Sequence, residues 1–283
     1  MNNMKRYFFL LLVLLSLLPI VVQGQSDVTR RVSAEDMGYR GRVQFFQSTE
    51  WCRDSEYAFF TTSAEEYNEA GLRTDMSIIE NIYQTNYHYE YDGNGRLVYS
   101  VETYYEGEKD SVVFHYAPDG CLMGYEEYAI SPDPYEGNSV TDYLVTCDAQ
   151  CRVLRYASAG EDSMRYNYDG QGRLTSMSGN GLPERIQTFY YDNNGRLTRV
   201  RMGAKYYEET HYRYNEKGDT IEVWHTNWEH VEGDVGAHGV GEHKYFDYTE
   251  YDDHGNWTKA TVTVKENRWK HTYFVVRTFK YYE

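Results

Sequence analysis

One seven-residue motif recurs along this chain, and it constrains the fold more than any other feature. It reads Tyr-Asp-x-x-Gly-Arg-Leu at residues 91–97, 168–174 and 191–197. Five weaker copies centre on Gly71, Gly120, Cys151, Gly218 and Gly255. Seven of the eight copies have Tyr four residues before this position, and seven have Asp or Asn three residues before it. Such repetition is typical of proteins that stack one supersecondary unit many times.

Each copy of the motif predicts a β-hairpin. Apolar and polar residues alternate before the turn, as expected for a strand with one buried face. The Asp accepts hydrogen bonds from the turn backbone, and the Gly supplies the left-handed conformation that closes a three-residue loop with a bulge. The Tyr then lies opposite the residue two positions after the Gly. The structural positions in the full copies are Tyr91, Asp92, Gly95, Leu97, Tyr168, Asp169, Gly172, Leu174, Tyr191, Asp192, Gly195 and Leu197.

Eight such hairpins predict an all-β fold, an antiparallel β-hairpin repeat array of about sixteen strands. The array is expected to span residues 41–283, with residues 25–40 as a linker or first edge strand. The 31 Tyr residues and the 17% aromatic content support this prediction, because aromatic side chains favour strands. The net charge of −16 argues against nucleic acid as the main partner.

Residues 1–24 have the pattern of a secretory signal peptide. Lys5 and Arg6 precede an apolar run over residues 7–22, and cleavage is expected after Gly24. A retained membrane anchor is the alternative, but the run is short for a full span and Pro19 lies near its end. The mature chain is therefore predicted to be periplasmic, cell-surface or secreted, without an integral membrane span.

Four cysteines follow the signal segment, which permits two disulfides in an exported chain. In the fourth copy of the motif, Cys147 and Cys151 replace the Tyr and the Gly. This double replacement suggests a Cys147–Cys151 disulfide in place of the aromatic contact, with Cys52 and Cys121 either joined or free. Mapping the disulfides by proteolysis without reductant distinguishes these arrangements.

The longest interval between copies holds four candidate metal ligands, His225, His230, His238 and His243, among several carboxylates. Clustered His and carboxylate groups suit Zn²⁺ or Cu²⁺, but these spacings match no helical zinc motif and glycines are dense. A long hairpin loop without metal is the alternative. The Asp-containing turns lack the ligand number of a calcium loop, and we predict no cofactor.

Catalysis has little support in the sequence, since no nucleophile elbow or other catalytic constellation is present. Aromatic residues outside the repeated Tyr position could instead stack on sugar rings. These candidate ligand-binding residues are Tyr104, Tyr105, Tyr190, Tyr206, Tyr207, Trp224 and Trp228.

The repeated units resemble YD repeats, also called RHS repeats, over roughly residues 57–283. The resemblance implies a bacterial, exported, repeat-built sheet that stays open, spirals or curls into a partial barrel. The motif of the self-cleaving core found in large members is absent, so their toxin-enclosing shell is not implied. We expect a non-catalytic structural or protein-interaction scaffold of the envelope or cell surface. The alternatives are a glycan- or peptide-binding module and, third, a glycan hydrolase.

Overall fold

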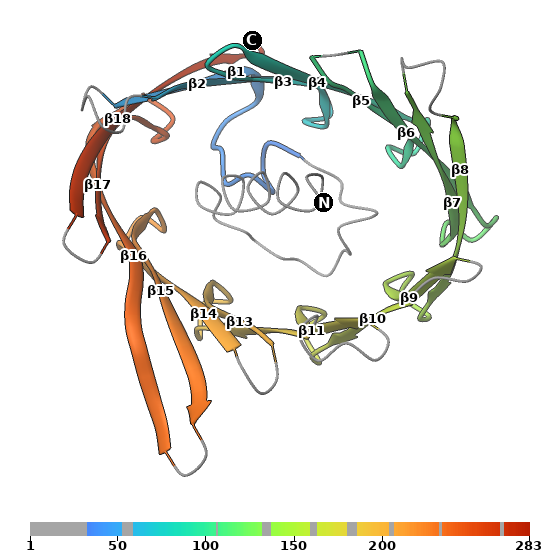
Figure 1. Cartoon of the computed structure of the whole chain (residues 1–283). Helices are drawn as coiled ribbons and strands as arrows, with labels where there is room; N and C mark the ends of the chain where they lie inside the picture. The colour runs from blue at the N-terminus through green and yellow to red at the C-terminus, as the bar shows by residue number, and fades with distance from the viewer. Residues whose placement is uncertain are drawn as a thin grey trace.

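A computed structural model of the chain describes residues 33–52, 59–105, 107–131, 137–158, 163–179, 186–203, 207–231, 234–266 and 269–283, without the side chains of residues 227–240. These residues form one sheet of 18 strands, in which each strand pairs antiparallel with the next along the chain. β1 also pairs with β18, so the sheet closes into the barrel that Figure 1 shows end-on. The all-β antiparallel fold is thus confirmed, and the sheet is closed rather than open. Within the described residues, no helix has the length and apolar character needed to cross a bilayer.

The strands are short on one part of the ring and long near the seam. They are β1 (Val43–Cys52), β2 (Phe59–Tyr67), β3 (Arg73–Glu80), β4 (Tyr83–Tyr91), β5 (Leu97–Thr103), β6 (Lys109–Tyr116), β7 (Leu122–Ile130), β8 (Ser139–Cys147), β9 (Val153–Ser158), β10 (Met164–Tyr168), β11 (Leu174–Gly179), β12 (Gln187–Tyr191), β13 (Leu197–Met202), β14 (Tyr207–Tyr214), β15 (Thr220–Val231), β16 (Asp234–Tyr251), β17 (Trp257–Glu266) and β18 (Trp269–Tyr281). The β15–β16 hairpin extends well beyond the ring (Figure 1).

The predicted hairpin geometry is confirmed at the motif turns. Tyr91 pairs with Leu97, and a bulge follows directly in the ladder. The Asp92 Oδ1 atom accepts backbone hydrogen bonds from Asn94 and Arg96, each 2.9 Å long. Gly95 takes φ +73°, the left-handed conformation that the loop requires. The same pairing with the same bulge recurs at Tyr168–Leu174 and Tyr191–Leu197.

The motif also joins several hairpins to the next, through contacts that the hairpin prediction did not include. The Arg173 side chain donates to Asp169 Oδ2 and lies 4.8 Å from the ring centroid of Tyr191 in the following copy. The hydroxyl of Tyr191 in turn donates to the carbonyl of Leu174 at 2.8 Å. We call this arrangement the Arg–Tyr clamp; it recurs at Arg96–Tyr116, Arg152–Tyr168 and Arg196–Tyr214. Cation–π contact and a hydrogen bond therefore explain why Arg and Tyr recur together.

A disulfide replaces the clamp at the one junction where both of its residues are missing. Cys121 stands at the Arg position and Cys147 at the Tyr position of the next copy. The structure joins Cys121 to Cys151, whose Cα atoms lie 4.7 Å apart, and leaves Cys147 and Cys52 as free thiols. The predicted Cys147–Cys151 disulfide was therefore wrong.

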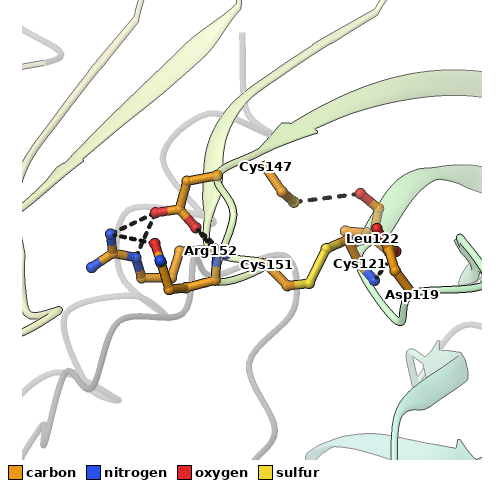
Figure 2. The surroundings of a disulfide bond; sticks show 8 residues. Asp119, Cys121, Leu122, Cys147, Cys151 and Arg152 are labelled. Carbon is orange, nitrogen blue, oxygen red and sulfur yellow. Dashed lines mark hydrogen bonds and ion pairs between the residues drawn. A yellow bond between two sulfur atoms is a disulfide. The ribbon is translucent and has the colours of Figure 1, made fainter.

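The physical reason lies in the directions of the two side chains, which Figure 2 shows. Cys147 occupies the half-buried, inward-facing Tyr position, and its thiol donates to the carbonyl of Leu122 at 3.5 Å, as the Tyr hydroxyl does elsewhere. Cys151 sits in the turn itself with φ +61° and faces the preceding turn, where Cys121 lies. The disulfide therefore joins two successive turns, and not the two sides of one turn.

Replacing Cys121 with Ser and Cys151 with Gly is expected to lower the free energy of unfolding by about 3 kcal/mol, the usual effect of opening a loop of this length. Gly at position 151 keeps the left-handed turn, so the loss isolates the disulfide. Denaturant unfolding measures it, with Cys147→Ser as a control that stays close to wild type. Peptide mapping that joined Cys147 to Cys151 would contradict the assignment.

The core lies on the inner face of the ring. The chain leading into β1 runs inside the ring in Figure 1, and Ala34, Met37 and Tyr39 in this segment pack against Phe46 and Phe279. Because successive side chains of a strand point to opposite faces of the sheet, the residues that alternate with these inward-pointing ones face the outside of the ring. Further buried clusters continue this inner face around the ring, through the apolar motif residues and the long strands β16–β18.

The seam between β1 and β18 is a ninth copy of the motif, split between the two ends of the array. Val43 pairs with Tyr281, and Phe45 with Lys280, so the bulge falls where it does in the other copies. Gly41 takes φ +86°, and the amide of Tyr282 donates to the carbonyl of Arg42 at 2.9 Å, as the Asp amide does in an intact turn. Residues 41–43 thus supply the Gly-Arg-Leu half, and residues 281–283 supply the Tyr-Asp half. Eight intact copies and one split copy account for all 18 strands.

Candidate functional site: an aromatic ladder on the outer wall

The structure gathers three of the sequence-predicted ligand residues on one outer surface. Tyr190 on β12, Tyr207 on β14 and Trp224 on β15 project from the face opposite the inner cluster. Tyr104 and Tyr105 lie apart from them, at the turn that joins β5 to β6. Tyr206 and the side chain of Trp228 fall outside the described residues.

Four rings form a continuous stack across strands β14 to β16. His211 stacks on Trp224 with ring centroids 4.9 Å apart and planes 6° apart. Trp224 contacts His243 at 5.7 Å, and His243 stacks on Tyr245 at 4.2 Å. On the next strand, the ammonium group of Lys265 lies 4.7 Å from the Tyr245 ring. His211, Trp224 and His243 occupy directly opposed cross-strand positions, and Tyr245 follows His243 two residues later on the same face of β16.

Two buried carboxylates hold the ends of this ladder. Glu209 bonds Arg199 at 3.2 Å, and the Arg199 guanidinium lies 3.8 Å from the ring of Tyr190. Glu222 bonds His243 at 2.6 Å and also contacts Arg213. Glu209 and Glu222 are therefore each paired with a cation or an imidazole, which offsets their desolvation.

Burial lowers the pKa of His211, although the charge of Glu209 partly opposes this. The imidazole is therefore held neutral at physiological pH, which suits its stacking on Trp224.

The stacking limits what the ladder can bind. Sugar recognition by stacking requires an aromatic face that is open to the ligand. His211 and His243 cover Trp224, Arg199 covers a face of Tyr190, and Arg201 lies 3.5 Å from the ring of Tyr207. Tyr190, Tyr207 and Trp224 therefore share one surface, but neighbouring side chains already cover at least one face of each ring.

The predicted metal ligands do not converge where the structure describes them. His225 bonds Thr210 on the inner face, whereas His243 bonds Glu222 on the outer face. The side chains of His230 and His238 lie outside the described residues. Asp119 lies close to Cys121 and Cys151, but these two sulfur atoms are joined to each other.

A buried ionic cluster on the inner face escaped the sequence analysis. Arg73 and Glu65 lie 3.6 Å apart with almost fully buried side chains, and the Tyr67 hydroxyl donates to Glu65. Tyr39 covers the cluster, and its burial raises its pKa well above the usual value. Nothing in the sequence pattern predicts that Tyr39 lies against Glu65. Glu65 precedes a motif turn, whereas Tyr39 precedes the first strand.

Glu50 makes the stability of the ring depend on pH. Burial raises its pKa to about 7, although Arg277 and Lys244 partly oppose this. The folded state thus favours the protonated form, so this stabilisation is complete below the unfolded pKa near 4.5 and is lost as the pH rises through about 7.

We expect the free energy of unfolding of the wild type to fall, relative to Glu50→Gln, by about 2–3 kcal/mol between pH 4.5 and pH 8.5. Denaturant unfolding at several pH values measures this difference. The exposed Glu90→Gln variant is the control and follows the wild-type profile. A Glu50→Gln profile parallel to wild type would show that Glu50 is not the titrating group.

Comparisons with known proteins give weak similarities only. No family model matches the chain. The "tRNA3(Ser)-specific nuclease WapA" of Bacillus spizizenii is 26% identical over 197 residues, covering 65% of this chain. The chain spans only 8% of the length of that nuclease. A "porin-like protein" from Bacteroides uniformis is 12% identical with a TM-score of 0.44, over 84% of this chain and 98% of that one. The structure titled "TcdB2-TccC3-TEV" is 16% identical with a TM-score of 0.36, over 74% of this chain and 11% of that one.

Proposed function

We propose that this chain is an exported, non-catalytic scaffold of the cell envelope or surface, built as a short YD-repeat ring. The observation that carries the proposal is closure: nine hairpins, hydrogen-bonded side by side, form a sheet without a free edge among the described strands. A closed sheet is a rigid body that does not recruit further strands, so its loops and outer wall are left for partners.

The repeat assignment rests on the motif and on its contacts. The copies around Gly95, Gly172 and Gly195 have the full motif and the same turn, with Asp oxygens accepting the backbone amides. The Arg–Tyr clamp gives those residues a shared structural task. The nuclease activity in the name of the distant relative is not carried over, because the matched region is a small part of that protein.

Chemical cross-linking of the tagged mature chain in intact cells tests the scaffold proposal. We expect the same few envelope proteins to be recovered in repeated experiments, and purified chain to show no hydrolysis of envelope polysaccharides. A chain that is found only in the cytoplasm, or one that turns over a polysaccharide, would contradict the proposal.

A glycan-binding role is the second candidate, because Tyr190, Tyr207 and Trp224 share one outer surface. Binding would require a ligand to displace Arg199 or Arg201 from a ring face. A glycan array with wild type and Trp224→Ala separates the two candidates. Array signals that wild type gives and Trp224→Ala loses favour glycan binding. An array on which neither wild type nor Trp224→Ala gives a signal favours the scaffold.

A further inference from the structure

The two ends of the ring differ in chemistry. At the end that carries the motif turns, the exposed tips hold Gly, Ala, Pro and polar residues, as at Gly93-Asn94 and Asn193-Asn194. At the other end, the described parts of five consecutive hairpins, from β17–β18 through β7–β8, each present an exposed apolar side chain. We name these residues the apolar rim: Phe60, Ile82, Tyr83, Tyr105, Ile130 and Trp269.

The tip of the β3–β4 hairpin shows that this exposure is not a by-product of folding. Ile82 is 72% exposed at a two-residue turn, beside Asn81 with φ +55°. Such turns favour Gly at the second position, and a β-branched residue there contributes no packing to the sheet. Tyr83 meets Tyr105 of the neighbouring hairpin edge-on, with ring centroids 5.9 Å apart, so these two hairpins share an apolar contact at this end.

The spacing of the apolar rim suits a deformable surface better than a protein pocket. The rim residues of neighbouring hairpins are two strands apart along the sheet, roughly 10 Å, and they flank the strand ends opposite the motif turns. A protein partner would need a separate matching pocket for each tip, whereas a lipid interface accepts scattered side chains at one depth. Trp and Tyr are the residues that favour the membrane–water boundary.

Charge identifies the kind of lipid. Among the described charged residues beside the apolar rim, acids slightly outnumber bases: Glu80, Glu108, Asp110 and Glu266 against Lys109, Lys265 and Lys270. The chain as a whole carries a net charge of −16, which repels an anionic surface. We propose that the apolar rim rests on a bilayer with zwitterionic headgroups and places the ring upright on it. This inference rests on the proposed envelope scaffold and names the surface on which the scaffold stands.

Flotation of the mature chain with phosphatidylcholine vesicles tests the inference, because these vesicles contain no protein partner. We expect wild type to float, and Ile82→Ser with Trp269→Ser to weaken partitioning at least about tenfold. Adding anionic lipid is expected to weaken wild-type binding at low salt, with recovery at high salt. The matched control is Leu144→Ser, which removes a 77% exposed apolar side chain from the wall of the ring and should bind as wild type does.

Brominated lipid adds a readout of depth. Quenching of fluorescence should fall when Trp269 is replaced by Phe and not when Trp224, on the outer wall, is replaced by Phe. Wild type that does not float, or Leu144→Ser that weakens binding as much as the rim variant, overturns the inference. Light scattering that shows a rim-dependent dimer in place of vesicle binding overturns it too, and assigns the apolar rim to a second copy of the chain. Neither of these results changes what cross-linking to envelope proteins in cells would show, so the scaffold proposal is tested separately.

Discussion

Deleting residues 281–283 is expected to lower the free energy of unfolding by about 3–5 kcal/mol and to cause self-association. The deletion removes the hydrogen bond between Asn256 and the Tyr281 hydroxyl, and the one from the Tyr282 amide to the Arg42 carbonyl. It also removes the Tyr281 ring from the inner cluster. With the split copy of the motif broken, the β1–β18 pairing is expected to fray from this end, and the strand edges that it exposes pair readily with other chains.

The matched control is Glu283→Ala, because Arg42 bonds the main-chain carbonyl of this residue at 3.1 Å and that group remains. Denaturant unfolding and light scattering compare the two variants. A truncated chain that stays monomeric with the stability of wild type would show that the split copy does not seal the ring.

Replacing Arg73 with Met is expected to cost about 3–5 kcal/mol, because it leaves the carboxylate of Glu65 buried without a cation. Both side chains are less than one-tenth exposed, so water cannot take the place of the lost partner. The double variant Glu65→Gln with Arg73→Met should recover a large part of the loss, since it removes both charges.

A double-mutant cycle by denaturant unfolding gives the coupling between these two residues. Arg165→Met is the control, since this Arg is exposed on the outer face of β10 and its loss should change stability by less than about 0.5 kcal/mol. Additive effects of the Glu65 and Arg73 changes would contradict the proposed pairing.

The repeat motif predicted the local structure well because its determinants lie within a few residues of one another. Asp92 and Gly95 specify the turn, and the turn sets Tyr91 opposite Leu97. The number of strands was underestimated because the ninth copy has its halves at opposite ends of the array. In the sequence, one half of this copy is Gly41-Arg42-Val43 and the other is Tyr281-Tyr282. Each half alone is too short to be recognised as a copy of the motif.

Contacts between hairpins were harder to predict for a similar reason. The Arg–Tyr clamp links residues in successive copies, so its register depends on how hairpins stack. The disulfide shows the consequence: sequence proximity favoured Cys147 with Cys151, but stacking brings Cys121 beside Cys151. For the outer surface, the sequence identified Tyr190, Tyr207 and Trp224, yet it did not reveal that Arg199, Arg201 and two His rings cover them.

Hydrogen exchange at the seam tests the closed ring most directly. Closure gives the strand β1 (Val43–Cys52) partners on both sides, β2 and β18. We predict that backbone amides throughout β1 exchange as slowly as those of β6 and β7, far from the seam. If every second amide of β1 instead exchanged as fast as in an unpaired edge strand, the sheet would be open and the account of a sealed ring would be contradicted.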